Sequence, residues 1–130
     1  MADHNIVHVE FSSHNPKESV QFYTDLFGWK HESMPEFDYY SWDNGNGTGG
    51  GYNKITDEPV PGGFVVNQGD VLVYVATDSV DASLARAEEL GGKVVTPKTE
   101  VPGMGWYGHF TDPAGNRVGV WQSARQEAVA

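Results

Sequence analysis

A histidine and a glutamate stand two residues apart near the start of the chain, in the stretch IVHVEF. His8 and Glu10 alternate there with apolar residues, as in a half-buried strand, so both side chains are expected on one face. An imidazole beside a carboxylate suits general acid–base catalysis. The pair is therefore a candidate catalytic site, although a purely structural hydrogen bond between the two side chains explains the same spacing.

A second group of chemically useful side chains lies near the end of the chain. Tyr107 and His109 alternate in GWYGHFT, and Gly119 stands between Val118 and Val120 in RVGVWQ. A glycine inside a strand adds no packing surface and marks a bulge, a close approach or space left for another group. We interpret Gly119 as space left on one face of the strand, with the two valines directed at the helices.

Composition excludes several classes of protein. The chain has no cysteine, which excludes disulfides, thiolate zinc sites and cysteine nucleophiles and leaves His, Asp and Glu as the strong metal ligands. A net charge of −10 argues against nucleic acid as a partner. The sequence has no apolar run of membrane-spanning length and no export leader. We therefore expect no membrane association and a cytoplasmic location.

The elements that must position these residues occur in the same order twice. Residues 5–13 read as a strand, 15–28 as a helix, and 30–35, 37–43 and 51–54 as strands. The order returns with a strand at 70–77, a helix at 79–92 and strands at 93–97, 105–111 and 116–122. An offset of 64 residues aligns Gly28 with Gly92 and Trp42 with Trp106. This pattern predicts a duplicated βαβββ unit in a single domain, residues 1–130, with module one at about 5–56 and module two at about 69–123.

The chain resembles a known family in three stretches. FYTDLFGW, the turn DPAGN and the intervening GNGTGGGYNK are similar to the vicinal oxygen chelate superfamily, which includes glyoxalase I, bleomycin resistance proteins and extradiol dioxygenases. The resemblance covers nearly the whole chain. It implies an α+β fold of two βαβββ modules with pseudo-twofold symmetry, curved mixed sheets that enclose a cleft, helices outside, and a homodimer.

The resemblance also implies where a metal would be held. In metal-dependent members the ligands come from the first and last strands of each module, which correspond here to His8, Gly51 with its neighbours, Leu72 and Gly119. Only His8 is a ligand, and protein metal sites use about three or four. We therefore expect no metal and no other cofactor. A divalent metal at His8, held by a shifted set of His8, Glu10 and His109, is the alternative. The other histidines, at positions 4, 14 and 31, are expected to be solvated.

The residues expected to bind a ligand are mostly aromatic. They are Trp42, Leu72, Tyr74, Trp106, Tyr107, His109, Gly119 and Trp121, with Trp42 and Trp106 at the rim of the cleft. Such a lining suits a small apolar or aromatic molecule. The sequence thus predicts a small-molecule-binding protein whose usual metal site is lost. A metal-dependent lyase or dioxygenase and a non-catalytic interaction domain stay as alternatives, so whether the protein is an enzyme is left open.

Overall fold

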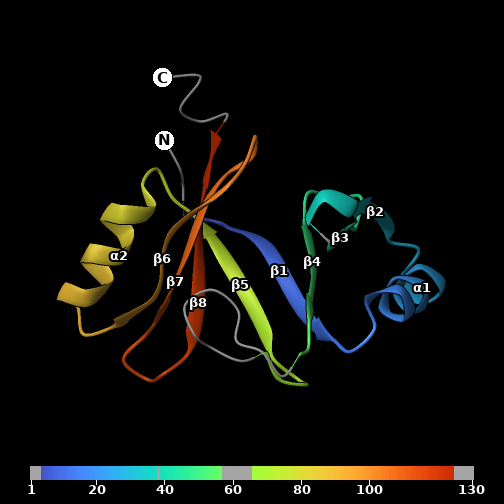
Figure 1. Ribbon diagram of the computed structural model, residues 1–130, viewed down its shortest axis with the longest axis horizontal. Helices are drawn as coiled ribbons and strands as arrows, with labels where there is room; N and C mark the ends of the chain where they lie inside the picture. Colours follow the sequence, from blue (N-terminus) through green and yellow to red (C-terminus); the bar gives the residue numbers. More distant parts are fainter. Residues whose placement is uncertain (1–3, 38, 57–65, 125–130) are drawn as a thin grey trace. The chain divides into compact units, whose positions relative to one another are not determined.

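The computed structural model describes residues 4–37, 39–56 and 66–124. These residues form two α-helices, one short 3₁₀ helix and eight strands, so the predicted α+β class is confirmed (Figure 1). They divide into two compact units, which are described separately. One unit comprises residues 7–37, 39–56 and 66–72, and the other comprises residues 4–6 and 73–124. We call them module one and module two and assign each helix or strand to the unit that holds most of it.

Module one contains one helix against a four-stranded mixed sheet. Its elements are β1 (Ile6–Ser13), α1 (Pro16–Phe27), β2 (Lys30–Met34), η1 (Pro35–Phe37), β3 (Tyr39–Asp43) and β4 (Gly49–Lys54). The strand order is β2-β3-β4-β1, in which β1 and β4 are parallel and the other neighbours are antiparallel.

Module two repeats this arrangement. Its elements are β5 (Val71–Ala76), α2 (Val80–Glu89), β6 (Lys93–Val101), β7 (Gly105–Thr111) and β8 (Arg117–Ser123). The strand order is β5-β8-β7-β6, with β5 and β8 parallel and the other neighbours antiparallel. The predicted duplication of a βαβββ unit with mixed sheets is therefore confirmed.

The helix boundaries follow from local signals that the sequence shows. Pro16 occupies the first turn of α1, and Gly28 ends the helix in the left-handed region (φ 71°), where its N–H bonds to the carbonyl of Thr24. The Ser79 side chain caps α2 by accepting a hydrogen bond from the N–H of Ala82. Neither helix of the described residues is long and apolar enough to cross a membrane.

Two strands differ from the expectation. A turn of 3₁₀ helix occupies Pro35–Phe37, so β3 begins only at Tyr39. Strand β6 runs on through Pro97 to Val101, because two register shifts against β7 absorb the irregularity there. Residues 57–65, between the two predicted modules, lie outside the described residues.

The two modules have different cores. In module two, Val80 and Leu84 of α2 are buried against Val120 of β8. In module one, α1 buries none of its residues completely, and aromatic rings fill the space between helix and sheet. Trp29 and Trp42 stack there with ring centroids 4.1 Å apart, and Phe11 and Tyr23 with centroids 5.5 Å apart. The helix of module one is thus attached through ring stacking, and that of module two through aliphatic burial.

Candidate functional site

His8 and Glu10 lie on the face of the module-one sheet that is turned away from α1, which we call its helix-free face. The alternate residue of β1, Phe11, stacks on Tyr23 of α1 and fixes the opposite face as the helix side. The prediction that His8 and Glu10 share a face is confirmed.

Tyr39 joins this pair from β3. Its hydroxyl donates to Glu10 Oε2 over 2.6 Å and lies 2.9 Å from His8 Nε2, while Nε2 lies 3.1 Å from Glu10 Oε2. Glu10 is buried, and the His8 side chain keeps 31% of its surface exposed. The three groups therefore form one hydrogen-bonded cluster, which reaches solvent on the histidine side.

The hydrogen-bond pattern assigns the His8 tautomer. An ionised carboxylate only accepts hydrogen bonds, and the single Tyr39 hydroxyl proton is donated to Glu10. The Tyr39 oxygen must then accept from His8, so Nε2 carries a proton and donates to both neighbours. A metal at Nε2 would have to displace this proton and both hydrogen bonds, and the lone pair of the neutral imidazole is then on Nδ1.

Tyr39 also explains a glycine in β4. A Cβ atom added to Gly51 would overlap the phenol ring and hydroxyl of Tyr39. In register, Gly51 pairs with Glu10 of the parallel strand β1. The position that the family resemblance assigns to a metal ligand of module one is therefore packed by a tyrosine side chain.

Module two also has a glycine that is packed by a tyrosine ring, on the face of its sheet turned away from α2. Gly119 of β8 pairs with Tyr74 of β5, as Gly51 pairs with Glu10, and an added Cβ at Gly119 would overlap the Tyr74 ring. Val120, the next residue, contacts α2 as predicted. The space that we interpreted as room for a ligand at Gly119 is thus filled by Tyr74, and the glycine marks a close approach.

A buried polar chain extends from Tyr74. Its hydroxyl is hydrogen-bonded to His109 Nε2 over 2.8 Å, and His109 Nδ1 is hydrogen-bonded to Thr96 Oγ1 over 2.9 Å. All three residues are buried. Both ring nitrogens of His109 are therefore engaged inside module two, which does not suit a role as a metal ligand in a shifted set.

Some of the predicted ligand-binding residues lie on the helix-free face of their sheet and others on the face that packs against a helix. Tyr107 shares the helix-free face with His109, at 5.3 Å between ring centroids, and pairs in register with the half-buried Trp121. Leu72 is buried two residues before Tyr74 on β5.

Two tryptophans lie elsewhere than predicted. Trp42 is buried under α1 in the aromatic core, and Trp106 packs on the helix side of module two against the cluster of Val80 and Leu84. The predicted rim position is wrong for both, because their strands present these positions to the helices. His31 is also not simply solvated, since both of its ring nitrogens are hydrogen-bonded.

The residues at the family's metal positions do not fit a metal. Leu72, Gly51 and Gly119 offer no ligand atom, two of these positions are packed by tyrosine rings, and the remaining histidine donates from Nε2. Within the part of the chain that the structure describes, no three His, Asp or Glu side chains are grouped as metal ligands.

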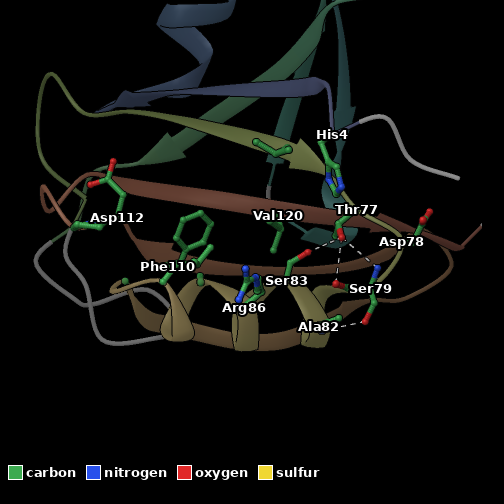
Figure 2. A pocket seen from close by; sticks show the side chains of 15 residues that line it. His4, Thr77, Asp78, Ser79, Ala82, Ser83, Arg86, Phe110, Asp112 and Val120 are labelled. Atoms are coloured by element: carbon green, nitrogen blue, oxygen red, sulfur yellow. Dashed lines mark hydrogen bonds between the residues drawn. The ribbon is translucent and has the colours of Figure 1, made fainter.

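A cavity of about 560 Å³ lies on the other face of module two, between α2 and strands β5 and β8 (Figure 2). It extends from His4 at one end to Asp112 at the other and includes none of the predicted site residues. The hydroxyl groups of Thr77 and Ser83 point into this region but bond to each other over 2.6 Å. The lining also includes the charged side chains of Asp78, Arg86 and Asp112.

Sequence reasoning missed two residues, Tyr39 and Thr96. Each reaches its histidine from another strand, Tyr39 from β3 and Thr96 from β6, so spacing along one strand could not identify it. The signal for Tyr39 was indirect: a glycine at a ligand position indicates either open space or the close approach of another group.

Comparisons with known proteins agree with this fold. The family model of the glyoxalase/bleomycin resistance protein/dioxygenase superfamily matches residues 5–120. CFP32 of Mycobacterium tuberculosis, a proposed glyoxylase, is 29% identical over 126 residues, which are 90% of this chain and 45% of that protein. The anthracycline biosynthesis protein DnrV of Streptomyces peucetius is 28% identical over 130 residues, covering 85% of this chain and 44% of DnrV. The chain thus spans less than half the length of these relatives.

Solved structures show the same fold at low sequence identity. Methylmalonyl-CoA epimerase from Mycobacterium tuberculosis superposes with a TM-score of 0.64 at 12% identity, over 96% of this chain and 91% of that one. A superfamily member from Vibrio splendidus gives a TM-score of 0.61 at 12% identity, over 92% and 97% of the two chains. From the match over residues 5–120, the chain belongs to the glyoxalase/bleomycin resistance protein/dioxygenase superfamily.

Proposed function

We propose that this protein binds a small apolar or aromatic molecule without a metal ion, on the helix-free face that carries His8, Glu10 and Tyr39. The observation that carries the proposal is the cluster itself: a tyrosine packs over the ligand-position glycine of module one, and its hydroxyl bonds to the one retained histidine. Hydrogen-bonding groups thus stand where metal-dependent members hold an ion.

The chemistry of the cluster defines what it can recognise. Nε2–H of His8 and the Tyr39 hydroxyl are donors held by a buried carboxylate, and His8 is half-exposed. A ligand oxygen or nitrogen that exchanges for one of these internal bonds would gain a positioned partner. The proposed specificity is therefore one polar group at His8 and an apolar body beside it.

A thermal-shift screen of small aromatic and apolar metabolites, run with and without a chelator, tests this function. A ligand at 100 times its Kd adds about 2.7 kcal/mol to the free energy of unfolding. We expect at least one compound to raise Tm equally in both conditions, with the effect reduced in Tyr39→Phe and retained in His14→Gln, an exposed control histidine. Stabilisation that occurs only with added metal contradicts the proposal.

A metal-free acid–base reaction at the same cluster is a second candidate. It is favoured by the proton that His8 shares with the buried Glu10 and Tyr39. Compounds found in the screen that carry an acidic C–H bond can be incubated with the protein in D₂O. Deuterium incorporation that is lost in Glu10→Gln supports catalysis, and binding without exchange supports the first function alone.

A further inference from the structure

His31 joins the helix of module one to its sheet. From β2, its Nδ1 lies 3.1 Å from Thr24 Oγ1 of α1, and its Nε2 lies 2.8 Å from the hydroxyl of Tyr52 on β4. The imidazole also stacks on the Tyr52 ring. No residue of α1 is completely buried, and this bridge is one of the polar contacts that join the helix to the sheet.

The neighbouring bonds assign the tautomer of His31. The carbonyl of Trp29 lies at the Thr24 end of the imidazole and acts to raise the pKa of His31, as an acceptor beside an imidazole N–H does, so we assign the proton to Nδ1, with the Thr24 oxygen accepting from it. Nε2 then holds the lone pair and accepts from the Tyr52 hydroxyl. The bridge therefore requires neutral imidazole in one particular tautomer.

A second proton on His31 is incompatible with this pattern. Protonated Nε2 becomes a donor and faces the donor hydroxyl of Tyr52, which must rotate to accept. Tyr52 is buried, and its hydroxyl has no other hydrogen-bond partner among residues 4–37, 39–56 and 66–124. The rotated hydroxyl would therefore keep its proton unpaired among aromatic rings, which is unfavourable.

We propose that His31 is an acid-sensitive latch: protonation at Nε2 breaks its bond to Tyr52 and favours a state in which the C-terminal half of α1 is released from the sheet. The latch consists of Thr24, His31 and Tyr52, all within module one.

The groups around the latch do not offset the added charge. The titratable side chains on the same face are the phenols Tyr52 of β4 and Tyr23 of α1 and the exposed Lys54 at the end of β4. Strand β3 presents Trp42 opposite His31. Lys30 and Glu32 of β2 itself and Asp43 of β3 alternate to the other face of the sheet. Asp25, next to Thr24, is exposed and accepts a hydrogen bond from Gln21.

The electrostatic environment acts in the same direction. Burial lowers the pKa of His31 below its usual value, although the backbone at Trp29 opposes this shift. A histidine whose folded-state pKa is lowered stabilises the closed state above about pH 6.5, its ordinary pKa, and this stability is lost as pH falls toward the lowered value. Release of α1 is therefore expected below about pH 6.5.

Hydrogen exchange of the α1 amides tests the latch. Between pH 7.5 and pH 5.5, after correction for intrinsic exchange rates, their protection should fall by up to about tenfold, while that of α2 changes less. His31→Gln, which cannot titrate, should abolish the fall, and Tyr52→Phe should reduce it. His14→Gln, an exposed histidine next to the start of α1, should leave it unchanged. Constant protection in the wild-type protein, or loss of the response in His14→Gln alone, overturns the proposal.

A measurement on the unmodified chain keeps the test independent of variant folding. Nitrogen-15 chemical shifts of the His31 ring should show a proton on Nδ1 at neutral pH and a titration midpoint below 6.5. A proton on Nε2 at neutral pH, or a midpoint at or above 6.5, overturns the assignment.

Discussion

The ring of Tyr74 occupies the position in which a side chain on Gly119 would stand. The two residues pair in register on neighbouring parallel strands, so the contact is built into the sheet. Gly51 accommodates Tyr39 in the same way in module one. Both tyrosine hydroxyls bond to a histidine, although the tyrosines come from β5 and β3. In both modules a tyrosine thus fills the space beside the equivalent glycine, but the two tyrosines come from strands that are not equivalent.

Gly119→Ala should destabilise the protein by about 1–3 kcal/mol, because the added methyl group overlaps a buried ring. Urea denaturation measures the loss. In the background of Tyr74→Ala the same substitution should cost much less, since the ring that it meets is gone. Equal costs in the two backgrounds would show that Tyr74 does not occupy this space.

Tyr39→Phe keeps the ring over Gly51 but removes the hydroxyl that bonds to Glu10 and His8. Its expected cost is about 1 kcal/mol of folding free energy, the typical value of one hydrogen bond. Ligands found by thermal shift should bind about tenfold more weakly, as expected when about 1.4 kcal/mol is lost. If the stability falls but ligand affinity does not, Tyr39 is structural only.

Thr96→Val preserves the shape of a buried side chain and removes the partner of His109 Nδ1. The loss of this hydrogen bond inside the module should cost about 1–3 kcal/mol. The double variant with His109→Leu should show less than the sum of the two single costs, because the first change already breaks the shared bond. Additive costs in chemical denaturation would mean that the two side chains are independent.

Much of the fold could be predicted from sequence because its signals are local. Alternation correctly predicted that His8 and Glu10 share one face of β1 and that Val120 faces a helix. Gly28 ends α1 as expected. The faces of β3 were harder to predict. FDYYSWD carries aromatic residues on both faces, so the pattern gives no preference, and Trp42 was placed on the wrong side.

The candidate site could be predicted only in part, because its contacts cross between strands. The pair on β1 was visible, but Tyr39 approaches from a strand almost thirty residues later. Gly119 was found, yet a glycine in a sequence does not show whether the vacated space is open or packed. Only the position of the Tyr74 ring decides between these cases.

Metal titration of the chelator-treated protein tests the account's central claim, that hydrogen-bonding side chains have replaced the metal of this site. Zinc, nickel, manganese and iron(II) are each titrated by calorimetry into the wild-type protein and into His8→Gln. The account predicts no stoichiometric binding in either protein, with Nε2 of His8 remaining protonated by nitrogen-15 chemical shift. One equivalent of metal bound by the wild-type protein, absent in His8→Gln and accompanied by deprotonation of Nε2, would contradict it.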